Sequence, residues 1–437
     1  MGSSDSRLKF EHGHIYLQTD KPFYIAGEPV TGHVFLGLEM PYPADHIDIQ
    51  VKGKEKCKWK DSYTTTHREG DRTVTRHHTV IRRGENKIFF HRTALFHFPM
   101  NTAAPGQYSF PFSFHLPASL PASVYYCGGK SSRAKITYHV KAIIEPAHGS
   151  NIKEMKYKQR LIVRQPVYDM GLNRMQSDRE EVNYCCCCCS KGHATITCQF
   201  EKEAYVPGEV CRALADIDNS QCSLECKGLV LKLEQKVELR GDGHEFKEDK
   251  TLVQRDFDGI GANEKTDGLN RFLELSTAGL RNEIKDKKKK EILPEDRNYG
   301  EMMQPTSNGH IVKFYYELSV NTRYETCCAN LPKVKIPLTI YPPPLPFFGQ
   351  FQAPPNWNPQ VYEPVNVVIP GMPMGPPVGM PPPGYAPPAM GMPPPPMGMP
   401  PQQQIAYPPP QQQMPYGGQP GYQQLPQQPG QEEEHQV

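Results

Sequence analysis

The chain has 437 residues and a formal net charge of +2, and 37% of its residues are hydrophobic. The composition changes at one end of the chain, where residues 342–437 hold 30 of the 46 prolines and no lysine or arginine. The four glutamates there leave +6 on the rest, which favours anionic membrane surfaces or acidic peptides but does not indicate nucleic-acid binding. No apolar run approaches the ~20 residues of a transmembrane helix, and no signal-peptide core is found. We therefore predict a cytoplasmic protein with two folded domains and a tail.

The first seven residues, Met1 to Arg7, fit the pattern for N-myristoylation, with Gly2 as the acylated residue and Ser6 at the required position. One acyl chain anchors only marginally, so stable membrane residence needs a second signal. The alternative is a disordered polar start.

One strand-turn-strand pattern occurs twice, as Tyr24-Ile-Ala-Gly-Glu28 and as Tyr205-Val-Pro-Gly-Glu209. Each copy is flanked by alternating apolar and polar residues, which is typical of strands with one buried face. The glycines allow the turn, and the two glutamates are expected to be structural turn residues. The duplication predicts two similar β domains in tandem, at residues 8–166 and 193–341.

Short alternating runs separated by glycine and proline turns fill the first domain, which is typical of a β-sandwich. One run, from Gln107 to Val124, reads Gln-Tyr-Ser-Phe-Pro-Phe-Ser-Phe-His-Leu-Pro-Ala-Ser-Leu-Pro-Ala-Ser-Val and precedes a strand-like Ile136–Ile143. The second half continues with further strand-like runs at Asp216–Ser220, Leu229–Val237, Lys313–Val320 and Val334–Ile340.

In these runs and in their order, residues 8–341 resemble the arrestins. Gly53 followed by Trp59 is similar to the α-arrestin, or arrestin domain-containing, branch. The resemblance implies an all-β fold of two tandem arrestin-type, Ig-like β-sandwich domains. Residues 98–108 are too short for the extra helix of the receptor-arresting branch, so we do not expect phosphoreceptor arrest.

Between the domains, residues 167–192 are expected to be a linker that carries five consecutive cysteines, Cys185, Cys186, Cys187, Cys188 and Cys189. Adjacent thiols on a linker could be S-palmitoylated and so supply the second membrane anchor. They could instead bind zinc, although an unbroken run lacks the usual turn residues. The third interpretation is an exposed, reduced run with no chemistry.

The second domain is interrupted by polar sequence at residues 240–309, including the lysine-rich run Lys285–Glu291. Such a run could contact anionic lipid. A solvated loop is the favoured interpretation.

The tail, residues 342–437, is rich in proline, methionine and glutamine and is expected to be disordered and partly polyproline II. It contains one Pro-Pro-x-Tyr motif formed by Pro382, Pro383 and Tyr385. A polyproline segment of this kind docks in the aromatic groove of a WW domain. The α-arrestins are similar in using such motifs to recruit HECT-type ubiquitin ligases.

We therefore expect an adaptor that links membrane cargo to trafficking, endocytic or ubiquitination machinery. Its expected partners are cytosolic regions of membrane proteins and WW-domain proteins such as HECT-type ubiquitin ligases, with peripheral contact at plasma membrane or endosome surfaces. We predict no enzyme activity and no catalytic residue, because the sequence has no catalytic motif. We also predict no cofactor, no metal site and no nucleic-acid partner.

The alternative function is a retromer-like coat subunit. A third hypothesis compares residues 18–27 with the opening of macroglobulin-like domains of secreted protease traps, a class that requires secretion and disulfides.

Overall fold

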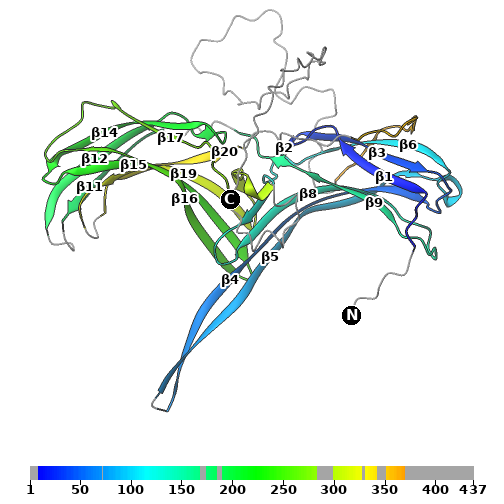
Figure 1. Cartoon of the computed structure of the whole chain (residues 1–437), viewed down its shortest axis with the longest axis horizontal. Helices are drawn as coiled ribbons and strands as arrows, with labels where there is room; N and C mark the ends of the chain where they lie inside the picture. The colour runs from blue at the N-terminus through cyan, green and yellow to red at the C-terminus, as the bar shows by residue number, and fades with distance from the viewer. Residues whose placement is uncertain are drawn as a thin grey trace, which may run out of the picture. The chain divides into compact units, whose positions relative to one another are not determined.

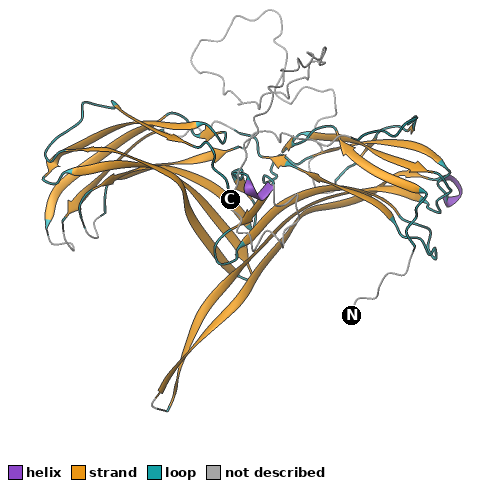
Figure 2. Cartoon of the chain, in the orientation of Figure 1, coloured by secondary structure: helices purple, strands orange, loops and turns teal. Residues whose placement is uncertain are grey.

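The computed structural model describes residues 8–70, 72–167, 174–184, 189–282, 299–326, 330–341 and 351–369. Figure 2 shows that β-strands make up nearly all the regular structure in these ranges. The helical turns in the described part are η1 (Pro99–Asn101) and a short turn at 299–301. No helix in these ranges is long and apolar enough to cross a membrane. The prediction of an all-β protein is confirmed.

The first sandwich consists of two main sheets and a small parallel pair (Figure 1). One sheet contains β1 (Gly13–Thr19), β3 (Pro29–Leu38), β6 (Gly106–His115), β21 (Gln360–Val361) and β22 (Val365–Asn366). The other contains β5 (Arg72–His97), β4 (His46–Glu69), β8 (Arg133–Ile144), β7 (Val124–Cys127) and β9 (Met155–Leu161). The pair is β2 (Tyr24–Ile25) with β10 (Val163–Arg164).

Alternation along the strands explains why the two sheets pack face to face. Val34 and Leu36 of β3 are fully buried, as are Ile47 and Ile49 of β4 on the facing sheet. All four belong to one continuous core. Burying a side chain of this size contributes about 1.5–3 kcal/mol, so the pattern specifies which face of each strand turns inward.

The second sandwich has the same construction. One sheet contains β11 (Met175–Asn183), β12 (Ser190–Phe200), β14 (Val210–Cys222) and β17 (Arg271–Ser276). The other contains β13 (Ala204–Tyr205), β20 (Lys333–Ile340), β19 (Val312–Arg323), β15 (Cys226–Gly241), β16 (His244–Ile260) and β18 (Ser307–Asn308). Each copy of the strand-turn-strand pattern, here called an arch, contains a two-residue strand. This strand pairs in parallel with the last strand of its own domain, β2 with β10 and β13 with β20. The duplicated sequence pattern therefore corresponds to a duplicated topology.

Three segments differ from the expectations. Strand β11 lies within the predicted linker, and β16 and β17 lie within the polar interruption. β11 and β16 are the outermost strands of their sheets and bury few side chains. An edge strand that is exposed to solvent on both faces can be polar throughout, so hydrophobic alternation does not reveal it. The third segment, residues 351–369, was expected to be disordered and instead contains β21 and β22.

Candidate partner-binding surfaces

Glu28 and Glu209 stabilise the turns of the two arches. The Ile25 N–H donates to the Glu28 carboxylate at 3.0 Å, and the Val206 N–H donates to Glu209 at 2.8 Å. The glycine before each glutamate has a positive φ, which favours glycine. Both glutamates are therefore structural turn residues, as predicted.

A buried carboxylate joins the two sandwiches. Glu55 of β4 is 1% exposed, and its oxygens accept the N–H groups of His310, Ile311 and Val312 at 2.9, 2.8 and 3.1 Å. These three residues lead into β19 of the second sandwich. A carboxylate that receives several backbone N–H groups makes stronger hydrogen bonds than a neutral acceptor. Glu55 therefore fastens the start of β19 to the first sandwich.

A second polar contact crosses the same junction at Tyr299. The buried Arg164 donates to the Tyr299 hydroxyl at 2.9 Å, and that hydroxyl donates to the Ser123 carbonyl at 2.6 Å. Nearby, the Gln304 side chain accepts the Tyr125 N–H at 2.8 Å. The junction thus combines a guanidinium, a phenol and an amide, and each is satisfied by a partner across it.

Residues 351–369, here called the docked segment, run along the edge of the first sandwich. Strands β21 and β22 pair in parallel with β6. The Tyr362 N–H donates to the Ser109 carbonyl at 3.0 Å, and the Val367 N–H donates to the Ser113 carbonyl at 2.7 Å. The segment therefore satisfies backbone groups of β6 that an uncovered edge would leave open.

Aromatic side chains hold the docked segment in place. Tyr362 stacks on Phe110 with ring centroids 5.1 Å apart, and Phe351 stacks on Phe35 at 4.4 Å. At the far end, Val367 and Ile369 are buried in the core of the first sandwich. Stacked pairs contribute about 0.5–1.5 kcal/mol beyond their area, so the segment is fastened along its length.

The pairing of β21 and β22 with β6 is an addition of strands to a sheet edge. Addition of a strand to a sheet edge uses main-chain hydrogen bonds for affinity and side-chain pockets for specificity. In this structure the chain's own segment fills both the edge and the aromatic surface beside it.

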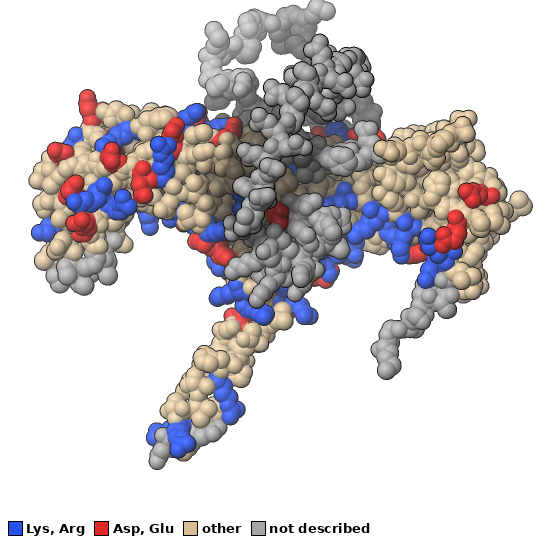
Figure 3. Space-filling view, viewed as in Figure 1, with Lys and Arg blue, Asp and Glu red and all other residues tan. Residues whose placement is uncertain are grey.

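The hairpin of β4 and β5 is a second prominent surface. The strands have 24 and 26 residues, but β8 pairs with β4 only as far as Lys58. Beyond that residue, among the described strands, β4 is paired with β5 alone, up to the pair Glu69 and Arg72. Figure 1 shows this part of the β4–β5 hairpin extending away from the sheet, and Figure 3 shows basic side chains at its tip and base.

The described cysteines differ in burial. Burial raises the pKa of Cys198 and Cys211 to about 12 and that of Cys57 to about 11, so these thiols are not reactive. Cys189, the last residue of the cysteine run, is exposed, and its carbonyl accepts the Tyr184 N–H at 3.0 Å. Of the other predicted site residues, Cys185 to Cys188, Gly2 and the Pro-Pro-x-Tyr residues lie outside the described ranges.

Comparison with known proteins defines the class of this fold. The model for the arrestin (or S-antigen) N-terminal domain matches residues 13–167, and the model for the C-terminal domain matches residues 190–345. The chain therefore belongs to the arrestin superfamily.

The curated relatives narrow the class to proteins of the α-arrestin kind. Arrestin domain-containing protein A of Dictyostelium discoideum is 27% identical over 47% of this chain and 34% of its own length. Arrestin domain-containing protein 4 of Mus musculus is 25% identical over 48% of this chain and 49% of its own length. Arrestin domain-containing protein 1 of Rattus norvegicus is 26% identical, over 51% and 46%. The chain thus spans a third to a half of the length of these relatives. Its similarity to this family supports an arrestin-like adaptor.

Sequence reasoning missed the docked segment because proline dominated its interpretation. A signal was present, since Phe351, Trp357 and Tyr362 are followed by the β-branched run Val365–Ile369. Aromatic and β-branched residues are enriched in strands, and no other part of the tail has such a run.

Proposed function

We propose that this chain is a non-catalytic adaptor that binds cytosolic regions of membrane proteins and recruits WW-domain ubiquitin ligases to them. One observation carries the proposal. The tail is fastened to the first sandwich as far as Ile369, and the Pro-Pro-x-Tyr motif begins 13 residues later in the sequence.

This spacing limits how far a recruited ligase can be from the sandwich. A fully extended chain spans at most about 3.3–3.6 Å per residue, so Pro382 lies within about 45 Å of Ile369. A partner bound at the motif is held at a high local concentration beside anything bound to the sandwich. Tethering of this kind needs no reacting group in the adaptor.

The ligase part of the proposal is tested with the full chain and a tandem WW-domain fragment of a HECT-type ubiquitin ligase. Tyr385→Ala should weaken binding at least tenfold, or about 1.4 kcal/mol, because the tyrosine fills the pocket beside the polyproline groove. Tyr422→Ala is the matched control, since Tyr422 lies in the same tail without paired prolines. Unchanged binding by Tyr385→Ala contradicts ligase recruitment through this motif.

The membrane part is tested by metabolic labelling with alkyne-tagged myristate and palmitate. We expect Gly2→Ala to lose the myristate label and serine replacement of Cys185 to Cys189 to lose the palmitate label. Absence of both labels from the wild-type chain contradicts acyl anchoring and leaves recruitment by cargo as the route to membranes. Stable co-purification with a stoichiometric partner would favour the coat-subunit alternative.

A further inference from the structure

Two histidines and an aspartate meet at one end of the β4–β5 hairpin. His46 begins β4 and His97 ends β5, and the two are paired in the register of the hairpin. Asp45 immediately precedes β4. One potential ligand atom from each of the three residues lies within 4.8 Å of the other two. Residues 51 positions apart in the sequence are thus brought together by strand pairing.

The spacing of these atoms is close to that of a tetrahedral zinc site. The Asp45 Oδ2 atom lies 2.9 Å from His46 Nδ1 and 3.5 Å from His97 Nδ1. Zinc binds histidine nitrogen and carboxylate oxygen at about 2.0–2.2 Å, which places tetrahedral ligand atoms about 3.3–3.5 Å apart. The Asp45–His97 distance matches this spacing, the Asp45–His46 distance is slightly shorter, and the ligand atoms of the two histidines lie within 4.8 Å of each other.

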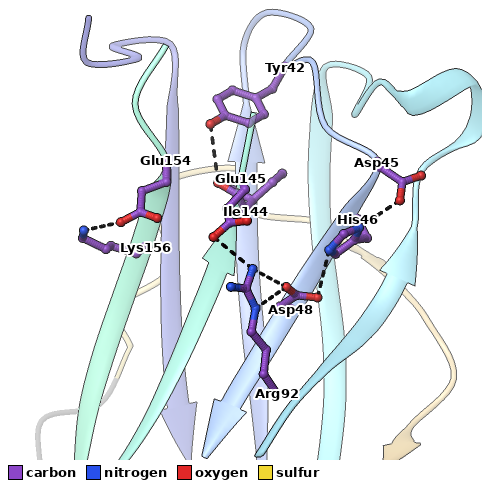
Figure 4. Close-up of polar contacts among 9 residues, drawn as sticks. All are labelled: Tyr42, Asp45, His46, Asp48, Arg92, Ile144, Glu145, Glu154 and Lys156. Carbon is purple, nitrogen blue, oxygen red and sulfur yellow. Dashed lines mark hydrogen bonds and ion pairs between the residues drawn. The ribbon is translucent and has the colours of Figure 1, made fainter. Parts of the chain in front are cut away.

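A partly buried ion pair between Asp48 and Arg92 orients the His46 ring (Figure 4). His46 Nε2 lies 3.3 Å from Asp48 Oδ1, and the Asp48 side chain is only 5% exposed. The other oxygen of Asp48 accepts the Arg92 Nε–H at 2.6 Å, and Arg92 also pairs with Glu145 at 3.1 Å. A metal-binding histidine usually donates its second N–H to a carboxylate in this way, which fixes the ring and raises its basicity.

The backbone around the cluster is also held. The Asp45 carbonyl accepts the Phe98 N–H at 2.6 Å, which ties the start of β4 to the residue after β5. The buried Tyr42 hydroxyl donates to the Lys153 carbonyl at 3.0 Å and so anchors the loop before Asp45. The side chains of Asp45 and His97 are 55% and 68% exposed. An ion and a water ligand can therefore reach these side chains from solvent.

We propose that Asp45, His46 and His97 form a zinc site that clamps the start of β4 to the end of β5. The ion replaces the proton between His46 Nδ1 and Asp45, which is released to solvent, and binds three protein atoms and one water. Imidazole with a single carboxylate selects zinc over magnesium or calcium, which prefer oxygen-rich shells. Neither the adaptor role nor the cysteine run is required for this site.

The experiment compares zinc binding by full-length chains in which Cys185 to Cys189 are serine, because those thiolates would compete for the ion. In His97→Gln the affinity of this site for zinc should fall at least tenfold. At a zinc concentration that fills the site of the parent chain, the parent should therefore bind one zinc ion more than the variant. Asp48→Asn should retain the ion with an affinity ten- to a hundredfold lower. His12→Gln is the matched control, since His12 is an exposed histidine that pairs with one carboxylate among the described residues, that of Glu39 at 3.8 Å.

X-ray absorption at the zinc edge separates this site from thiolates elsewhere. The difference between parent and His97→Gln should show nitrogen and oxygen neighbours only. Equal zinc uptake by the two chains overturns the proposal and leaves the cluster as a network of ion pairs. A sulfur-only shell in the parent also overturns it, whereas His97→Gln with an unchanged far-ultraviolet spectrum and reduced uptake supports it.

Discussion

The Glu55 contact makes a sharp prediction because one side chain serves three backbone donors. In Glu55→Gln the side chain keeps its shape, but its oxygen can face Ile311 and Val312 or His310, not all three. Hydrogen bonds to a charged group contribute about 1.5–3 kcal/mol each and neutral ones about 0.5–1.5. By the lower ends of these ranges, one lost bond and two weakened ones cost at least about 3.5 kcal/mol.

This loss is measured by scanning calorimetry together with amide hydrogen exchange. At about 2–4 °C per kcal/mol, the unfolding midpoint should fall by at least roughly 7–14 °C. Exchange should accelerate at residues 310–312, where the donors lose their acceptor. The control is Glu85→Gln, because Glu85 pairs with Lys56 at 2.7 Å on the surface and should cost less than about 1 kcal/mol. A midpoint shift for Glu55→Gln no larger than that of the control, with unchanged exchange at 310–312, refutes the assignment of Glu55 as the fastener.

Three further predictions concern single residues. Burial, reinforced by the positive charge of Lys158, lowers the pKa of the half-buried His139 to about 3 from 6.5. The unfolded chain binds more protons between these values, so stability falls as pH decreases below 6.5, and His139→Gln should abolish about 1–2 kcal/mol of the loss at pH 5. Trp357→Ala should accelerate proteolysis within the docked segment while leaving both sandwiches folded, because the indole packs on Phe35 at 6.1 Å. Gly53→Ala should destabilise the first sandwich by about 1–3 kcal/mol, since a Cβ there would lie 2.8 Å from the Tyr138 ring.

Each of these has a distinct contradicting result. Parallel stability curves for wild type and His139→Gln between pH 7 and 5 would show that this histidine titrates normally when folded. Identical cleavage of wild type and Trp357→Ala would mean that backbone pairing alone holds the segment. A wild-type midpoint for Gly53→Ala would mean that the neighbouring rings move aside without cost.

Local pattern predicted the features of this fold that depend on neighbouring residues. Alternation and turn residues specify the arches at Tyr24 and Tyr205, and the burial of every second side chain follows from them. The turn roles of Glu28 and Glu209 are equally local, because each carboxylate caps an N–H three residues earlier.

Contacts between distant segments lie beyond such patterns. The Glu55 side chain meets residues 255–257 positions later in the chain, and Phe351 donates to Gln18 across 333 positions. A lone glutamate in a strand is interpreted as solvent-facing unless its partners are known, since unpaired charges are rarely buried. The sequence supplies the residue type, whereas the tertiary fold supplies the reason for its burial.

The histidine cluster shows most clearly why side-chain period alone is insufficient. Two irregularities shift the β4–β5 register, one between Ile47 and Asp48 and one between Gly53 and Lys54. At the first, Leu95 is an extra residue on β5, so Asp48 pairs with Ala94 and shares a face with Arg92. Under unbroken alternation Arg92 would lie on the opposite face, and Asp48 would be a buried carboxylate without its guanidinium. A single bulge therefore creates the ion pair that orients His46, and a strict two-residue period predicts the opposite arrangement.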